Sequence, residues 1–133
     1  YTIRSYSDVE DIRRIIRERP QKLNLNEFYL VAQEYEPGTD EFTEVFETAV
    51  RMFPDDTIAN LNAANAAMRR GDLTAAKRYL AKTDNSPEAV YARGALAIRQ
   101  KDYNSARRYL NEAKSLGSEQ AGITLEQLEK GKH

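Results

Sequence analysis

The sequence predicts an all-α protein in which the helices form antiparallel pairs. Apolar residues recur at helical spacing along eight segments, and no alternating strand pattern appears after Tyr6. Short turns join most of these segments, as in an array of α-hairpins. A ten-residue stretch that begins at Gly71 also recurs thirty residues later, which indicates an internal repeat.

The composition fits one ordinary domain. The chain has 133 residues, of which 41% are hydrophobic and 31% are charged, so it can bury a core and is not of the disordered class. No apolar run approaches the roughly 20 residues of a spanning helix, and we expect no direct insertion into a membrane. The absence of Cys excludes a disulfide framework, Cys-ligated zinc and a thiol nucleophile. We expect residues 7–133 to form a single helical domain.

The first residues differ in character from the rest. Tyr1 and Ile3 alternate as in a strand, so we expect residues 1–6 to be a residual strand or linker from a preceding domain. A frayed N-terminal tail is the alternative. Ser7 and Glu10 then form a capping box, which predicts the start of the first helix.

Local signals predict where the other helices begin and end. Ser86 precedes Pro87, which is a favourable N-cap followed by proline at the first helical position. Asp72, Asp102 and Ser118 are also expected to be N-caps. Prolines and glycines interrupt the apolar stripes between helices. The expected helices cover residues 7–19, 25–35, 41–53, 57–70, 73–82, 87–100, 103–116 and 119–129.

The internal repeat spans a turn and the helices on both sides of it. Gly71–Leu80 aligns without gaps with Lys101–Leu110. The helices before these turns share a register as well. Corresponding positions hold Asn60, Ala63, Ala64 and Ala67 in one copy and Val90, Arg93, Gly94 and Ala97 in the other. Small residues at such positions allow two helices to approach closely.

This register resembles the tetratricopeptide repeat, in which a large residue, a Leu-Gly pair and a Tyr recur on the first helix and a Gly-Asp-Tyr turn follows. Ala76 and Ala106 hold the small position of the second helix, and Leu80 and Leu110 hold its large position. The resemblance covers about residues 25–116. It implies a right-handed α-solenoid of about three helix pairs, with flanking capping helices over residues 7–19 and 119–130.

Several positions depart from the family pattern. An earlier and more divergent copy carries Phe42 and Phe46 on its second helix. Thr83 replaces the usual Ala of the middle copy, and the two turns lie thirty residues apart rather than the family's roughly 34. Arg93 stands where the family usually buries Leu. We therefore expect the Arg93 side chain either to extend into solvent or to reach the groove.

The resemblance also implies a binding surface. In this family the first helix of each pair lines a concave groove, along which a peptide lies. The candidate groove residues are Asn26, Tyr29 and Gln33, then Leu61, Asn62, Asn65 and Arg69, and finally Tyr91, Ala95 and Arg99. Tyr and Arg are favoured interface anchors, and Asn can bond to a peptide backbone. The alternative is that Leu61 and Tyr91 simply pack against neighbouring helices. Leu61 also occupies the place of the Lys with which some members clamp a terminal carboxylate, so no such clamp is expected.

We expect neither an enzyme nor a cofactor. The single His is His133, so neither a His-based triad nor a His-ligated metal site can be assembled. The glycines are scattered rather than gathered in a phosphate-binding loop. The acidic residues between Glu34 and Glu47 fit a solvated helix face better than a pair of catalytic carboxylates.

The net charge of −1 conceals a division along the chain. Residues 21–56 contain two basic and nine acidic residues, whereas residues 57–114 contain eleven basic and five acidic ones. These segments therefore carry −7 and +6. Ordinary solvated surface charge is one interpretation. The other is a dipolar surface that orients a partner or a second copy of the chain. The overall charge gives no general attraction to nucleic acid, and no nucleic-acid partner is expected.

The sequence thus favours a non-enzymatic module that binds a protein or peptide. The alternative is a structural scaffold or self-association domain, whose oligomers would be sensitive to salt. Ser5–Glu10, the Arg-rich helix after it and Asn24–Glu27 are similar to the junction before the C-terminal helices of bacterial OmpA-like cell-envelope proteins. That similarity implies a place at the end of a larger envelope protein and favours the bacterial periplasm or cell envelope over the cytoplasm.

Overall fold

The fold was analysed in a computed structural model that describes residues 11, 14–36 and 38–131. The described part of the chain is all-α and contains no strand, which confirms the predicted class. Residues 14–18 are helical. After them come the 3-10 helix η1 (Pro20–Lys22) and the helices α2 (Leu25–Ala32), α3 (Asp40–Met52), α4 (Thr57–Arg70), α5 (Leu73–Leu80), α6 (Pro87–Arg99), α7 (Tyr103–Ser115) and α8 (Glu119–Gly131). The predicted strand over residues 1–6 and the Ser7–Glu10 capping box lie outside the described residues.

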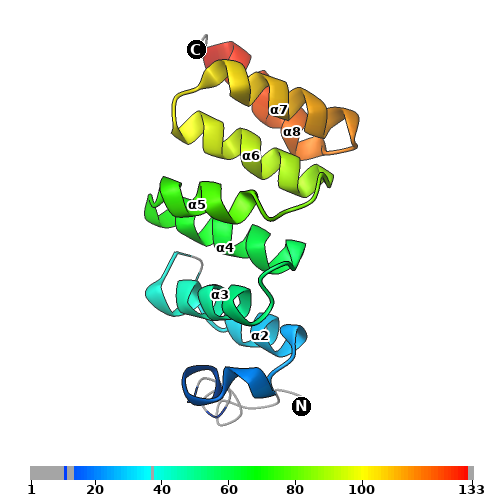
Figure 1. Cartoon of the computed structure of the whole chain (residues 1–133). Coiled ribbons are helices and arrows are strands. Elements are labelled where there is room, and N and C mark those ends of the chain that lie inside the picture. The colour runs from blue at the N-terminus through cyan, green and yellow to red at the C-terminus, as the bar shows by residue number, and fades with distance from the viewer. Residues whose placement is uncertain (1–10, 12–13, 37, 132–133) are drawn as a thin grey trace.

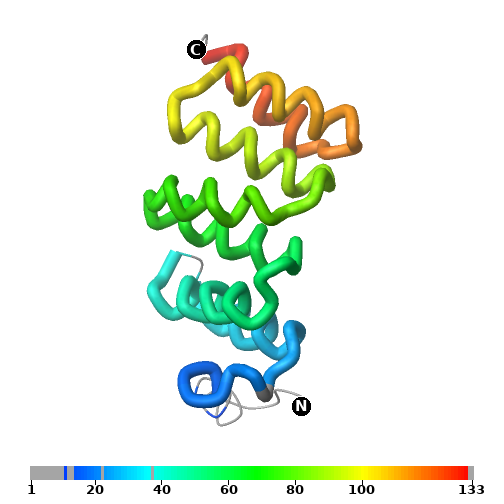
Figure 2. The backbone as a smooth tube through the Cα atoms, viewed as in Figure 1, coloured from blue at the N-terminus to red at the C-terminus, as the bar shows by residue number. Residues whose placement is uncertain are grey.

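The helices are stacked along the long axis of the molecule, from α2 near one end to α8 at the other (Figure 1). Each helix packs against the next one in the chain, and α4 also packs against α6. The continuous path of the backbone is visible in Figure 2. The architecture is repeat-like, and its core is divided among three hydrophobic clusters along the stack.

The helix boundaries agree with the sequence prediction to within one or two residues, with one larger difference. The helix over residues 25–35 was predicted too long, because α2 ends at Ala32. The amides of Glu34 and Tyr35 donate to the carbonyls of Val31 and Ala32, three residues back, so the chain tightens into turns there.

Side-chain caps begin the helices where the sequence places them. Asp72 and Asp102 accept from the amides of residues 75 and 105 at 3.1 and 3.2 Å. Ser86 accepts from the Ala89 amide at 3.3 Å, and Ser118 from that of residue 121 at 3.1 Å. All four predicted N-caps are therefore confirmed, and each satisfies an amide that the first helical turn leaves free.

The two turns of the repeat have the same backbone geometry. Gly71 and Lys101 have φ angles of 82° and 62°, in the left-handed region. The amide after each donates 2.9 Å to a carbonyl five residues earlier, that of Ala67 or Ala97. This is the hydrogen bond of a Schellman motif, which caps the end of a helix.

Close packing between α6 and α7 depends on Gly94. A Cβ atom at this position would lie 2.9 Å from Cδ2 and 3.0 Å from Cγ of Leu110, whose side chain is fully buried. Ala106 and Ala113, on the same stripe of α7, are also fully buried. The small residue on the first helix therefore allows the large one on the second to fill the interface.

Arg93 neither extends freely into solvent nor lines the predicted groove. Its guanidinium donates to Asn85 Oδ1 at 2.9 Å, to the Asp84 carbonyl at 2.8 Å, and to Oγ1 and the carbonyl of Thr83 at 3.0 and 3.3 Å. Thr83 and Arg93 are two of the departures from the repeat pattern noted above, and hydrogen bonds join them in the structure. Together they tie α6 to the connection that follows α5.

Candidate functional site

Three of the predicted groove residues meet in one open pocket. Tyr29 and Gln33 on α2 and Asn62 on α4 line a volume of about 390 Å³. Tyr35, which follows α2, and Phe42 on α3 form part of its wall together with Phe46 and Ala32. The pocket therefore joins residues from α2, α3 and α4, and the first residues of α2 and α4 are 32 positions apart in the sequence.

Aromatic rings give the pocket its apolar wall. Phe42 and Phe46 pack edge to face with centroids 4.9 Å apart, and Tyr29 lies 6.0 Å from Phe46. Phe42 and Phe46 were predicted only as residues on the second helix of the divergent first copy, and their role as pocket lining was missed. A signal for this role was present in the sequence, because Phe42 stands at the position that the later copies fill with the small residues Ala76 and Ala106.

The Tyr29 hydroxyl is held by the start of α4. It donates to Asp56 Oδ2 at 3.4 Å, and the same carboxylate oxygen accepts from the Ala59 amide at 2.8 Å. Burial, and secondly the negative charge and hydrogen bond of Asp56, raise the pKa of Tyr29 above its ordinary value. Tyr29 is therefore a neutral donor that links α2 to the cap of α4.

Tyr29, Leu61 and Tyr91 occupy one equivalent position in the three copies, and all three are half-buried. Leu61 packs against the cluster that α4 forms with α5 and α6. The Tyr91 hydroxyl lies 3.1 Å from Oγ1 of Thr124 on α8. Leu61 and Tyr91 thus pack against neighbouring helices, as the alternative interpretation had it, and only part of each side chain is available to a ligand.

Ala95 is half-buried and packs against the cluster that α4 forms with α5 and α6, whereas the other remaining groove candidates are polar and lie at the surface. Asn26, Asn65, Arg69 and Arg99 are exposed, and their side chains form no hydrogen bond or ion pair with any described residue. Asn62 is half-buried and donates from Nδ2 to the Ile58 carbonyl at 2.9 Å, which leaves its Oδ1 as an acceptor. The pocket does not include Asn65, Arg69, Tyr91 or Arg99.

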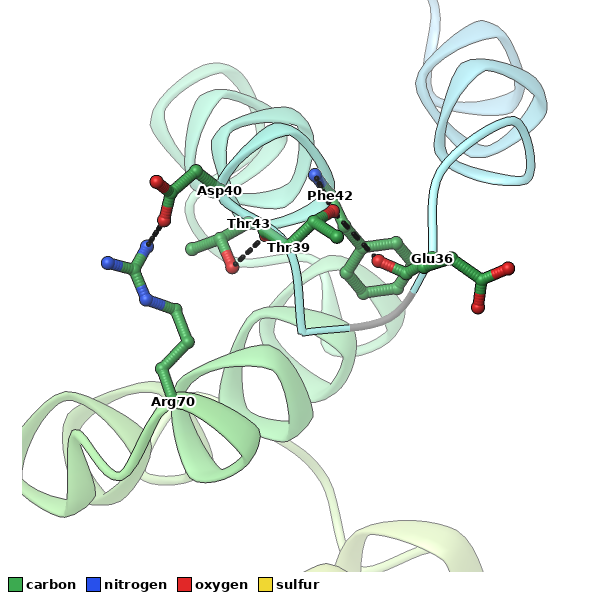
Figure 3. Close-up of polar contacts among 6 residues, drawn as sticks. All are labelled: Glu36, Thr39, Asp40, Phe42, Thr43 and Arg70. Carbon is green, nitrogen blue, oxygen red and sulfur yellow. Dashed lines mark hydrogen bonds and ion pairs between the residues drawn. The ribbon is translucent and has the colours of Figure 1, made fainter.

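Polar contacts join the start of α3 to Glu36, which precedes it, and to α4 (Figure 3). Thr39 donates from Oγ1 to the Glu36 carbonyl at 2.8 Å and accepts from the Phe42 amide at 3.2 Å. The carboxylate of Asp40 forms an ion pair with Arg70 of α4 at 3.2 Å. These contacts orient the beginning of α3, and with it the Phe42 ring in the pocket wall.

Two kinds of feature are absent among residues 11, 14–36 and 38–131. No cluster of three or more His, Asp or Glu side chains is placed to hold a metal ion in these ranges. Nor does any helix within them have the length and apolarity to cross a membrane. In the acidic segment, Glu44 pairs with Arg17 at 3.1 Å and Asp40 with Arg70.

No protein-family model matches the chain, and no curated protein matches it significantly.

Proposed function

We propose that this chain is a non-enzymatic binding module, a right-handed α-solenoid of the tetratricopeptide type, that holds a peptide or protein surface on the face formed by α2, α4 and α6. The pocket that gathers Tyr29, Gln33 and Asn62 carries the proposal. These three residues were predicted to bind a peptide from their positions in the repeat, and all three line the same pocket. A purely structural role would not require them to share a pocket.

The chemistry of the pocket suits an extended peptide with an apolar side chain. The rings of Phe42 and Phe46 offer an apolar wall, and burying one apolar side chain against such a wall contributes about 1.5–3 kcal/mol. The amide group of Gln33 and Oδ1 of Asn62 are available to bond to a peptide backbone. Asn65 and Arg69 extend the same polar surface along α4.

Selection of peptides against the purified chain tests this function. Displayed twelve-residue peptides would be selected, and their affinities measured by fluorescence anisotropy for the wild type and for Gln33→Ala/Asn62→Ala. We expect the double variant to weaken binding at least tenfold. Asn65→Ala/Arg69→Ala should weaken it less, because these residues lie outside the pocket.

The matched control is Gln120→Ala/Asn111→Ala, which removes the same two side-chain amides from exposed positions on α8 and α7. It should leave the affinity unchanged. Peptides that bind the wild type, Gln33→Ala/Asn62→Ala and Asn65→Ala/Arg69→Ala equally well would contradict a role for the α2–α4–α6 face.

Self-association is the second candidate function, favoured by the charges of −7 and +6 on successive segments. Glu34, Glu36, Glu41 and Glu47 are exposed and form no ion pair with a described residue. Head-to-tail stacking of copies would place this acidic segment against the basic one and would form a scaffold. Sedimentation at low and high salt tests it: an oligomer that dissociates with salt is expected, and a monomer at both salt concentrations contradicts it.

A further inference from the structure

Two crevices on another surface of the molecule are equivalent by the repeat. The first, where α3, α4 and α5 meet, has a volume of about 210 Å³, and the second, where α5, α6 and α7 meet, about 480 Å³. We call them the α3–α5 crevice and the α5–α7 crevice. Six lining residues of the first crevice have an equivalent thirty residues later that lines the second. The first of these pairs is Ala63 and Arg93, and the last is Tyr79 and Tyr109. None of the predicted groove residues lines either one.

The equivalent positions carry different charges. The α3–α5 crevice contains Glu47, Arg70 and Asp72, and Arg70 is already paired with Asp40. In the α5–α7 crevice, Lys77 and Ala81 take the places of Thr43 and Glu47, Arg93 that of Ala63, and Gln100 that of Arg70. Asp72 and Asp102, the N-caps of α5 and α7, line the two crevices at equivalent positions. The charged lining residues sum to −1 in the α3–α5 crevice and to +1 in the α5–α7 crevice.

Polar groups of the α5–α7 crevice are left for a ligand. The side chains of Lys77, Gln100 and Tyr109 form no hydrogen bond with any described residue. Arg93 gives its hydrogen bonds to uncharged oxygen atoms of residues 83–85, and it forms no ion pair with a described carboxylate. The Asp84 carboxylate interacts electrostatically with Arg93 without forming an ion pair and partly balances its charge, so Lys77 is the cation of this crevice that has no acidic partner among the described residues.

The floor of the same crevice is apolar. Leu80 and Leu96 line it and are almost fully buried, with 3% and 6% of their surfaces exposed. An apolar floor below a cationic rim complements a side chain that has a carboxylate at the end of an aliphatic stem.

We propose that the α5–α7 crevice binds a glutamate-rich segment of a partner protein, with carboxylates at Lys77 and aliphatic stems against Leu80 and Leu96. The complementarity between the cationic Lys77 and Arg93 and a run of carboxylates is the basis for this occupant, and a second copy of the chain, whose exposed Glu34, Glu36, Glu41 and Glu47 carry the same charge, is an outcome that the test distinguishes. The segment 57–114, which contains the crevice, carries a net +6, and this charge attracts an acidic partner over a longer range.

The test uses the full chain and two fluorescein-labelled peptides of twelve residues. In one peptide, Glu alternates with Leu and Gly, and in the other each Glu is replaced by Gln. We expect the Glu peptide to bind at least tenfold more tightly than the Gln peptide. The variant Lys77→Thr/Ala81→Glu, which installs the residues of the α3–α5 crevice, should weaken binding of the Glu peptide at least tenfold.

The matched control is Thr74→Glu/Lys82→Thr, which makes the same change in net charge at exposed positions of α5 and the residues after it, outside the crevice. Circular dichroism should show unchanged helix content for both variants. Equal loss of Glu-peptide binding in Lys77→Thr/Ala81→Glu and in the control would overturn the proposal, since the peptide would then respond to the net surface charge and not to the crevice.

Two further outcomes separate this site from the others. Loss of Glu-peptide binding in Gln33→Ala/Asn62→Ala would place the peptide in the α2–α4–α6 face and overturn the crevice site while supporting the proposed function. A salt-sensitive oligomer of the wild type that the Glu peptide dissociates would identify a second copy as the occupant and overturn the assignment to a partner. Unchanged binding in the Gln33→Ala/Asn62→Ala variant supports the crevice whatever happens to the first function.

Discussion

The helix pairs α4–α5 and α6–α7 are the most similar parts of the molecule, and their differences are informative. Both pairs turn at a residue with positive φ and cap the second helix with Asp. They differ where Ala63 and Ala64 of the first pair become Arg93 and Gly94 of the second. The backbone of the turn is thus common to the repeat, whereas single side chains decide how tightly the helices pack and what the surface presents.

The largest effects should come from changing the contact between Gly94 and Leu110. Gly94→Ala places a Cβ 2.9 Å from the buried Leu110 side chain, and we expect it to lower the free energy of unfolding by about 1–3 kcal/mol. Gly122→Ala is the control, because a Cβ at this helical glycine would meet its nearest neighbour at 3.7 Å. The control should be stabilising by up to about 1 kcal/mol, from helix propensity. Denaturant unfolding followed by circular dichroism measures both.

A double-mutant cycle sharpens this prediction. Leu110→Ala alone should cost about 2–5 kcal/mol, because it leaves a cavity in the core. In that background Gly94→Ala should cost less than it does in the wild type, since its clash has been removed. Strictly additive effects would show that the contact between Gly94 and Leu110 does not limit the packing of α6 on α7.

The next effect concerns Arg93, which the first pair lacks. Arg93→Ala removes four hydrogen bonds to residues 83–85, and we expect a loss of about 1–3 kcal/mol in the free energy of unfolding. Arg93→Lys should recover only part of it, because an ammonium group cannot reproduce the guanidinium fork. Hydrogen exchange of the connection between α5 and α6 should rise in Arg93→Ala. Equal stability of the wild type and Arg93→Ala would contradict this tie.

A smaller effect is expected at the two turns. Lys101 adopts φ 62° at the place of Gly71, and a side chain in this region costs about 1 kcal/mol relative to glycine. Lys101→Gly should therefore stabilise the chain by up to about 1 kcal/mol, and Gly71→Ala should destabilise it by a similar amount. Thermal or denaturant unfolding of the two variants measures the difference, and a stabilising Gly71→Ala would show that the two turns are not equivalent.

The smallest effect is a pH dependence specific to the second pair. The hydroxyl and amide of Ser105 donate to Asp102 and hold the pKa of its carboxyl below the ordinary 3.8, whereas the first pair has Ala75 in place of this serine. Because the folded pKa is the lower one, this stabilisation is present above pH 3.8 and is lost as the pH falls through the folded pKa. The stability difference between the wild type and Asp102→Asn should therefore shrink on acidification below pH 3.8, and Ser105→Ala should make that change smaller. A difference that is constant with pH would contradict the assignment.

Much of the fold could be predicted from the sequence because its signals are local. Caps such as Ser86 and Asp72 act on amides three residues away, and the apolar stripes follow the period of the helix. The one larger error, the length of α2, arose where tight turns replaced the expected last helical turn. The candidate site was predicted only in part: Tyr29, Gln33 and Asn62 meet in the pocket, but Phe42 and Phe46 were predicted as residues of the second helix of the first copy and not as lining.

The sequence by itself determined the helices, their caps and the repeat register, since these depend on residues within a few positions of one another. Only the tertiary structure decided which side chains contact one another across the repeat and which charged side chains stay unpaired. Tyr29 and Tyr91 find their hydroxyl partners 27 and 33 residues away, and the two crevices combine side chains of three helices each. Such contacts arise from the stacking of whole helices, which no local pattern specifies. The same stacking placed Arg93 on Thr83 and left Lys77 without a partner in the described chain.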